Sequence, residues 1–185
     1  MNIAIVGATG NVGRKTLEVL EKKDLPIDNL YLVASSKSVR KKIKFKGVDH
    51  EIYDLESFDF SRVKICFFAA GGKISEKFAE KAAKNCLVID NSSHFRMDPD
   101  VPLIVPQVNS EDLKTIKKNI VANPNCSTAQ LVIALKPLHD LFSIKRIVVS
   151  TYQSVSGGGK APMDELIEQT KLVLDGKKVK SKNFT

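Results

Sequence analysis

Short apolar runs alternate with helix-like stretches along most of the chain. Runs of consecutive apolar residues are typical of buried parallel strands, because both faces of such strands are covered. Such runs occupy residues 2–6, 30–35, 63–70, 86–90 and 119–122. Apolar residues at helical spacing predict helices over residues 12–20, 75–85 and 109–117. The alternation predicts an α/β protein with a doubly wound parallel sheet.

The pattern after residue 126 predicts a further unit. A helix is expected to begin after Cys126 and to run only to about residue 135, because Pro137 cannot donate a helical hydrogen bond. A long strand is expected over residues 144–153, followed by a helix over residues 162–175 that a glycine stops. We expect the long strand to begin a second unit.

The turn after the first strand carries three glycines. It reads GATGNVG, with Gly7, Gly10 and Gly13 in a variant of the dinucleotide-binding fingerprint. Glycines at these positions allow a tight turn and let backbone N–H groups approach a pyrophosphate at the helix N-terminus. The pattern favours dinucleotide binding by a Rossmann-like sheet over a merely structural turn.

The end of the second strand predicts which dinucleotide binds. NAD-binding sheets carry an Asp or Glu here, which holds the ribose 2′-hydroxyl. This chain reads VASSKSVRKK, with no acidic residue between this strand end and position 49. A carboxylate would repel a 2′-phosphate, whereas Ser35, Lys37, Ser38 and Arg40 can donate hydrogen bonds to it. The predicted cofactor is NADP(H).

The net charge of +8 and the pI near 9.3 indicate an anionic partner. Aromatic residues make up 6% of the chain, and no stretch interleaves them with basic residues as a nucleic-acid stacking platform does. A phosphorylated small molecule therefore explains the basic residues around position 40 better than nucleic acid. A solvated charged face is the alternative interpretation.

Composition also limits location and chemistry. No apolar run approaches the roughly 18 residues that span a bilayer, and the start lacks the basic leader of a signal peptide, so we expect no membrane association. Three cysteines make no disulfide framework, which favours the reducing cytoplasm. The three histidines lack metal-ligand spacing, so no metal site is expected.

Cys126 stands where a turn meets a helix, in the stretch NPNCST. A helix N-terminus carries unpaired N–H groups and a partial positive charge, which favour the reactive thiolate. Cys126 is therefore a candidate nucleophile, and the alternative is a small buried hydrophobic residue. Cys66 and Cys86 lie in apolar strand-like runs and are expected only to pack.

Four stretches together resemble the aspartate-semialdehyde dehydrogenase family: GATGNVG, DNSSHFRMD, NPNCST and STYQSVSGGG. The resemblance implies a Rossmann-like NADP-binding domain over residues 1–127 and the beginning of an α+β catalytic and dimerisation domain over residues 128–185. It also implies NADPH-dependent reduction of L-aspartyl 4-phosphate to L-aspartate 4-semialdehyde and phosphate. That reaction leads toward lysine, diaminopimelate, threonine and methionine.

The resemblance implies a role for each matching residue in the reaction. Cys126 would attack the acyl phosphate and form a thioester, and Gln153 would orient the substrate or the thioester. Arg96 would bind the departing phosphate, with Asn125 beside it. An arginine suits a phosphate because its planar fork can bind two oxygens.

The resemblance also assigns the cofactor contacts. The residues around the pyrophosphate would be Gly7, Thr9, Gly10, Asn11, Val12 and Gly13. Ser35, Lys37 and Ser38 would lie near the 2′-phosphate, and Ser156 and Gly157 near the nicotinamide.

Two departures from the family pattern bear on function. Lys37 stands where arginine is usual, which keeps the charge but loses the bidentate geometry. Relatives are nearly twice as long, and their acid–base histidine lies in the half without a counterpart here. We therefore expect a fragment of a homodimer or larger oligomer that binds NADPH weakly and turns over little substrate.

Two other interpretations stay open. An N-acetyl-glutamyl-phosphate reductase would share the reaction class, although NPNCST differs from the NPGCYPT that is usual there. The chain could also be a catalytically inactive NADP-binding module.

Overall fold

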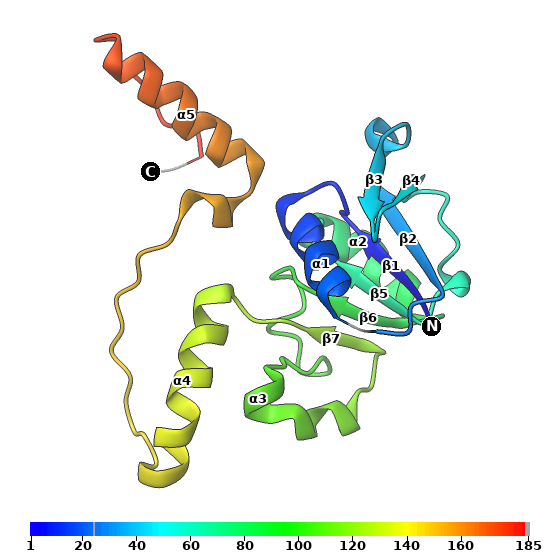
Figure 1. Cartoon of the computed structure of the whole chain (residues 1–185). Helices are drawn as coiled ribbons and strands as arrows, with labels where there is room; N and C mark the ends of the chain where they lie inside the picture. Colours follow the sequence, from blue (N-terminus) through cyan, green and yellow to red (C-terminus); the bar gives the residue numbers. More distant parts are fainter. Residues whose placement is uncertain (24, 184–185) are drawn as a thin grey trace. The chain divides into compact units, whose positions relative to one another are not determined.

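The computed structural model describes residues 1–23 and 25–183, which divide into two compact units. The first unit spans Met1–Ile147 and the second spans Val148–Thr185. The first holds the sheet and its helices (Figure 1).

The first unit is built on a seven-stranded sheet with the strand order β3-β4-β2-β1-β5-β6-β7. All neighbouring strands are parallel except the pair β3 and β4, which is antiparallel. The strands are β1 (Asn2–Val6), β2 (Asn29–Ala34), β3 (Lys42–Phe45), β4 (Val48–Asp54), β5 (Ile65–Phe68), β6 (Leu87–Asp90) and β7 (Ile120–Ala122). The α/β fold with a Rossmann-like sheet is confirmed.

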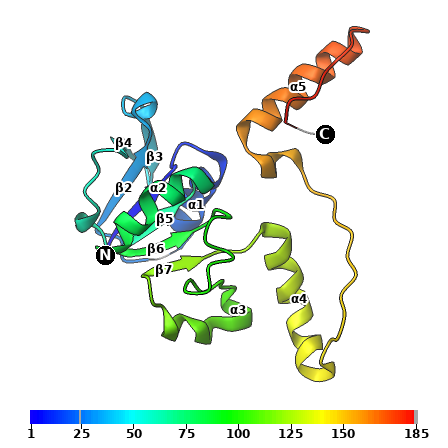
Figure 2. The ribbon, with the colours of Figure 1, turned by 180° about the vertical axis from the view of Figure 1, so that it is seen from behind.

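Two helices cover opposite faces of this sheet (Figures 1 and 2). They are α1 (Asn11–Lys22) and α2 (Gly72–Ala83), each joining two parallel strands. Residues of β1 point alternately to the two faces: Ile3 and Ile5 pack with Leu17 of α1, whereas Ala4 and Val6 belong to the cluster that contains Phe78 of α2. Both faces of β1 are thus buried from solvent, which explains its continuous apolar run.

The remaining helices and turns of the first unit lie in the connections between strands, except α4, which follows the last strand. They are α3 (Pro106–Asn109), α4 (Cys126–Phe142) and the 3-10 turns η1 (Ser36–Ser38), η2 (Phe60–Arg62) and η3 (Ser110–Thr115). The predicted helix over 109–117 is thus the end of α3 followed by a 3-10 turn.

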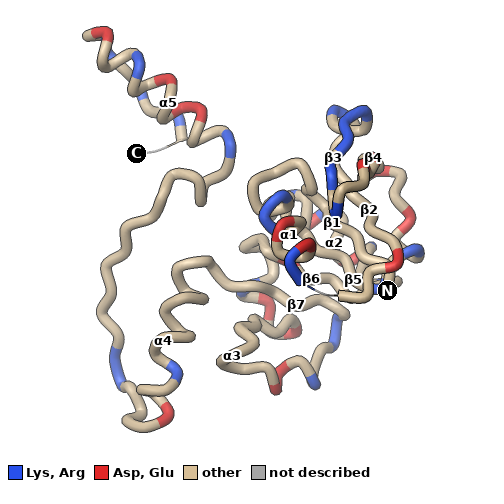
Figure 3. Tube along the Cα trace, in the orientation of Figure 1, with Lys and Arg blue, Asp and Glu red and all other residues tan. Residues whose placement is uncertain are grey.

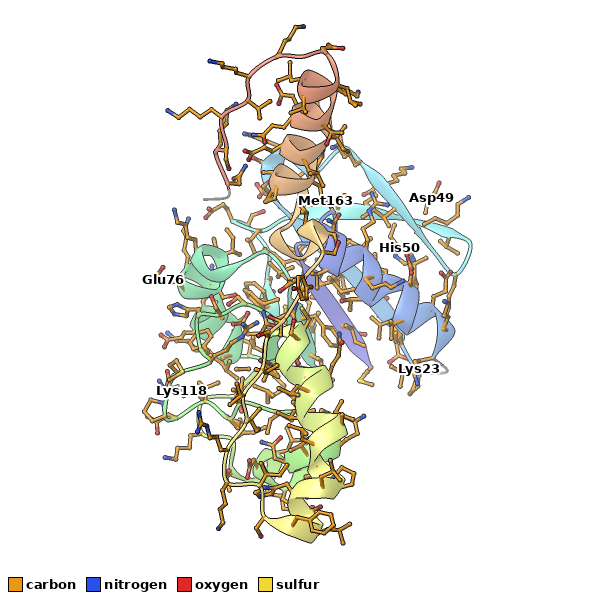
Figure 4. The ribbon with its side chains drawn as sticks, turned by 90° about the vertical axis from the view of Figure 1, so that its left-hand side faces the viewer. Lys23, Asp49, His50, Glu76, Lys118 and Met163 are labelled. Carbon is orange, nitrogen blue, oxygen red and sulfur yellow. The ribbon has the colours of Figure 1, made fainter. Side chains whose placement is uncertain are left out.

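Three expectations about the elements were wrong or incomplete. Helix α4 continues through Pro137 to Phe142, because a proline removes one hydrogen bond of a helix without preventing the following turns. The predicted strand over residues 144–153 does not form, because none of the described residues pairs with it. The antiparallel hairpin of β3 and β4, on which Figure 4 labels Asp49 and His50, was not predicted.

The second unit contains the 3-10 turn η4 (Val155–Gly158) and α5 (Lys160–Leu174). The Glu165 carboxylate of α5 accepts hydrogen bonds from the backbone N–H groups of Lys182 and Asn183, at 2.6 and 2.9 Å. These bonds hold residues 182–183 against the helix.

Candidate active site

The glycine loop joins β1 to α1 with close backbone contacts. Gly7 has a φ of +86°, and a Cβ there would lie 2.7 Å from the Ala69 backbone. A Cβ on Gly13 would lie 2.3 Å from the Gly7 carbonyl oxygen, below any real carbon contact. The Gly10 N–H closes the turn on that same carbonyl at 2.9 Å. The loop therefore requires glycine at positions 7 and 13.

Helix α1 begins directly after this loop. Gly10 is its N-cap and supplies no side-chain cap hydrogen bond, and the first N–H groups of a helix have no intrahelical acceptor. The side chains of Asn11 and Val12 are exposed, and Thr9 is half-buried. An open helix N-terminus at the carboxyl end of a parallel strand suits a pyrophosphate.

The predicted 2′-phosphate residues follow β2 in the turn η1. Ser35 and Lys37 are exposed, whereas Ser38 is 9% exposed and its N–H donates to the Ser35 carbonyl at 2.8 Å. Arg40 is also exposed. Lysine and arginine gather along this turn and β3, as Figure 3 shows. The local charge is therefore suited to a phosphate.

The strand register places four strand ends in one row. Val6 of β1 pairs with Phe68, Phe68 with Asp90 of β6, and Asp90 with Ala122 of β7. Gly7 of the glycine loop, Asn91 of the DNSS stretch and Asn123 of the NPNC stretch each directly follow such a strand end. Ligands of open α/β sheets bind at this edge.

Cys126 is the first residue of α4, and its side chain is exposed. The Asn125 side chain caps the helix by accepting a hydrogen bond from the Ser127 N–H at 2.9 Å. The Cys126 Sγ lies 3.9 Å from the Asn125 Oδ1. The structure thus places this thiol, with its side chain exposed, at a capped helix N-terminus.

Arg96 lies beside the loop that carries Cys126. Its Nε donates to the Asn123 carbonyl at 2.9 Å, and its Nη2 donates to the Asn91 carbonyl at 3.3 Å. The Asn123 side-chain amide also donates to the Asn91 side-chain oxygen. Sequence reasoning missed both asparagines, and the signal was an asparagine directly after each of two neighbouring strands.

A groove connects the start of α1 with these two asparagines. It has a volume of about 480 Å³ and is lined mainly by apolar side chains of α1 and the sheet. Val12 lies on its wall together with Asn91 and Asn123. Val12 of the GATGNVG stretch and the two asparagines that Arg96 contacts therefore border one continuous space.

The other predicted site residues belong to the second unit. Gln153, Ser156 and Gly157 are exposed, and Ser156 and Gly157 lie in η4. A Cβ on Gly157 would lie 2.1 Å from the Gln153 Nε2, so the glutamine side chain rests on the Gly157 backbone. The three residues are thus neighbours within this unit.

Family models match both parts of the chain. Residues 2–116 match the semialdehyde dehydrogenase NAD-binding domain, and residues 135–185 match the semialdehyde dehydrogenase dimerisation domain. The chain belongs to the semialdehyde dehydrogenase family. The resemblance to aspartate-semialdehyde dehydrogenases is confirmed, and the first match supports a nicotinamide cofactor.

Relatives of this family align along the whole chain. Aspartate-semialdehyde dehydrogenase 2 of Vibrio cholerae is 50% identical over 100% of this chain and 55% of its own length. The crystal structure of aspartate semialdehyde dehydrogenase II from Vibrio cholerae, complexed with ASA, matches this chain with a TM-score of 0.94 and 49% sequence identity. The match covers 100% of this chain and 55% of that protein's chain. The Candida albicans enzyme with NADP has a TM-score of 0.63 and 29% identity over 77% of this chain and 48% of its own. The chain thus spans about half the length of these semialdehyde dehydrogenases.

The other two cysteines of this semialdehyde dehydrogenase chain are buried, as predicted. Burial raises the pKa of the Cys66 thiol well above its ordinary value. The Cys86 thiol donates to the Ala82 carbonyl at 3.3 Å. Cys126 is therefore the exposed thiol of the three.

No helix in the described part of the chain is long and apolar enough to cross a membrane. Residues 1–23 and 25–183 contain no group of three or more His, Cys, Asp or Glu side chains that could hold a metal ion.

Proposed function

We propose that this chain carries the NADP-binding site and the nucleophile for reduction of L-aspartyl 4-phosphate to L-aspartate 4-semialdehyde and phosphate. The observation that supports it most directly is the exposed Cys126 thiol at the start of α4, directly after a loop whose Asn123 carbonyl is hydrogen-bonded to Arg96. A nucleophile beside a phosphate-binding arginine suits an acyl phosphate, in which attack and leaving-group departure occur at one carbon.

The proposed reaction has two steps. The Cys126 thiolate attacks the acyl carbon, the carbon–oxygen bond to phosphate breaks, and phosphate leaves beside Arg96 and Asn125. Hydride from NADPH then reaches the thioester carbonyl, and the carbon–sulfur bond breaks to give the aldehyde, the thiolate and NADP⁺. Splitting the reduction in this way replaces one difficult step with two easier ones. Gln153 orients the acyl group in this proposal.

NADP rather than NAD is part of the proposal. Support comes from the exposed Lys37 and Arg40 after β2 and from the absence of an acidic residue between the end of β2 and Asp49. Gly7, Thr9, Gly10, Asn11, Val12 and Gly13 would bind the pyrophosphate, Ser35, Lys37 and Ser38 the 2′-phosphate, and Ser156 and Gly157 the nicotinamide end.

The assignment of functions to the two parts of the chain is also a proposal. Residues 1–127 would bind the dinucleotide, and residues 128–185 would begin the catalytic and dimerisation domain. The match of residues 135–185 to a dimerisation domain supports a homodimer or larger oligomer for the whole protein. We also propose that the whole protein is a cytoplasmic enzyme of the aspartate pathway.

A single-turnover experiment tests the nucleophile. The chain is incubated with aspartate 4-semialdehyde and NADP⁺, the reverse direction, in which oxidation of the Cys126 adduct gives an aspartyl thioester and NADPH. Mass spectrometry should find one aspartyl group on the peptide that contains Cys126, released by hydroxylamine. One turnover suffices, so slow overall catalysis does not prevent detection.

Cys126→Ser is the matched control, because serine keeps the helix start and removes the sulfur. It should bind NADPH like the unaltered chain and take up no aspartyl group. The proposal fails if the unaltered chain binds NADPH but stays unacylated, or if the label appears on Cys66 or Cys86.

A further inference from the structure

Asp90 is a buried carboxylate at the carboxyl end of β6, with no exposed surface. Its Oδ1 accepts hydrogen bonds from the Ser75 hydroxyl at 2.6 Å and from the Ser92 N–H at 3.1 Å. Its Oδ2 accepts from the Ser92 hydroxyl at 2.7 Å. All three donors are neutral, so hydrogen bonds alone compensate the cost of burying this carboxylate.

The two serines connect Asp90 to different parts of the fold. Ser75 lies on α2 and is fully buried, so its bond ties the carboxylate to the helix layer. Ser92 lies in the loop after β6, and its hydroxyl also accepts a hydrogen bond from the His94 N–H at 3.1 Å. The loop from Asn91 to Arg96 therefore winds around the Asp90 side chain.

The backbone of Asp90 is hydrogen-bonded to Asn123, one of the two residues whose carbonyls bind Arg96. Its carbonyl accepts a hydrogen bond from the Asn123 N–H at 2.8 Å. Asn123 and Asn91, which follows Asp90 directly, supply the two carbonyls that the Arg96 guanidinium binds. The Asp90 carbonyl thus holds Asn123, and its carboxylate holds Ser92, the residue after Asn91, so both acceptors of the guanidinium lie at or next to a hydrogen bond of Asp90.

We propose that Asp90 is a positioning residue that fixes the Arg96 guanidinium in the orientation in which it binds phosphate. The proposal rests on the proposed function for the role of Arg96, and it adds the group that sets its geometry. Asp90 touches no reacting atom in this account. Its side chain acts through the turn that Ser92 closes. Its backbone carbonyl acts through Asn123, directly after β7.

Two serine variants separate positioning from stability. Removing a fully buried carboxylate endangers folding itself, so the test changes its partners instead. Ser92→Ala and Ser75→Ala each delete one hydroxyl that donates to Asp90, and both should lower the melting temperature. Only Ser92→Ala breaks the connection to the Arg96 loop, so only it should disturb the guanidinium.

The first measurement is the Nε–H signal of Arg96 in a ¹⁵N-resolved NMR spectrum, identified by its loss in Arg96→Lys. The hydrogen bond to the Asn123 carbonyl gives this proton a distinct chemical shift and slows its exchange with water. In Ser92→Ala the proton should exchange several-fold faster and its shift should move toward that of an exposed arginine. In Ser75→Ala the exchange rate and the chemical shift of this proton should both stay as in the unaltered chain.

The second measurement is the affinity for inorganic phosphate, by calorimetry. Ser92→Ala should weaken it about fivefold, corresponding to one misplaced hydrogen bond, and Ser75→Ala less than about twofold. Failure of the unaltered chain to bind phosphate would count against the proposed function, while the Nε–H signal still judges the positioning role.

Two results overturn the inference. One is an Arg96 Nε–H signal that Ser92→Ala leaves unchanged. The other is an equal change in both variants, which would show that loss of either hydroxyl merely loosens the fold.

Discussion

The Arg96 Nε donates a hydrogen bond of 2.9 Å to the backbone carbonyl of Asn123, three positions before Cys126 in the chain. A second bond, from Nη2 to the Asn91 carbonyl, joins the same guanidinium to the end of β6. The side chain therefore bridges two neighbouring strand ends. The arginine proposed to bind phosphate is therefore hydrogen-bonded to the loop that precedes the proposed nucleophile.

Replacing Arg96 with lysine tests this bridge. Lysine keeps the charge, but its ammonium cannot donate to both carbonyls and still present a planar fork to phosphate. We expect phosphate affinity to fall about tenfold and the free energy of unfolding to fall by about 1 kcal/mol. Calorimetry and urea unfolding measure the two effects. Arg146→Lys, an exposed arginine of the same unit, is the control and should change neither.

The glycine loop gives a second prediction. In Gly13→Ala the new methyl group would lie 2.3 Å from the Gly7 carbonyl, whereas in Gly10→Ala it would lie 3.4 Å from the same atom. Gly13→Ala should lower the free energy of unfolding by about 2 kcal/mol or more, because backbone on both sides must move. Gly10→Ala should lower it by less than about 1 kcal/mol.

Urea unfolding of both variants measures the difference, and NADPH titration should show weaker binding in Gly13→Ala. Equal stability of the two variants would contradict the close packing of α1 against the loop. Gly47→Ala offers no useful control here, since Gly47 has a φ of +80° and is strained by any side chain.

Local sequence patterns predicted the parts of the fold whose partners lie nearby in the chain. The run at residues 2–6, the glycine loop and α1 form one continuous unit, and each has a recognisable signal. The hairpin of β3 and β4 was missed because Lys42 and Lys44 alternate with Ile43 and Phe45. That alternation marks a half-exposed edge strand, but its lysines were interpreted only as a basic cluster.

Long-range pairing explains the failures. The stretch over residues 144–153 has the composition of a strand, yet a strand exists only where another strand accepts its hydrogen bonds. The contacts of Arg96 were equally invisible, because its two acceptors are backbone carbonyls of Asn91 and Asn123. Sequence motifs report side chains, whereas these carbonyls are placed by the register of β6 and β7.

Cofactor preference gives a third prediction. Lys37 is exposed in the turn after β2, where the 2′-phosphate of NADPH would lie. Lys37→Ala should weaken NADPH binding about fivefold and leave NADH binding within about twofold, because only NADPH carries the 2′-phosphate. Fluorescence titrations with both nucleotides measure this, and higher salt should reduce the difference.

Lys44→Ala is the matched control for that experiment. Lys44 is an exposed lysine on β3, so its removal lowers the net charge by the same amount. It should leave NADPH affinity within about twofold of the unaltered chain. An equal loss in both variants would indicate a general effect of charge instead of a contact at Lys37.

Glu165 makes the attachment of residues 182–183 to α5 dependent on pH. The hydrogen bond from the Lys182 N–H is the main cause that lowers the pKa of this carboxyl, with burial opposing it. A lowered pKa in the folded state means that the contribution to stability is complete above the ordinary value of about 4.3. It is lost as pH falls through the lower folded value. NMR shifts of the Lys182 and Asn183 amides should therefore stay constant at neutral pH and move below about pH 4.

Glu165→Gln checks the assignment, because the amide keeps the shape but removes the charge and one acceptor oxygen. The Lys182 and Asn183 amide signals should be displaced at neutral pH and should no longer move in the acidic range. Glu168→Gln, an exposed residue one turn along the same helix, should keep the acidic transition. If the transition persisted in Glu165→Gln, another acid would control this segment, and the two short hydrogen bonds to Glu165 would not hold it in solution.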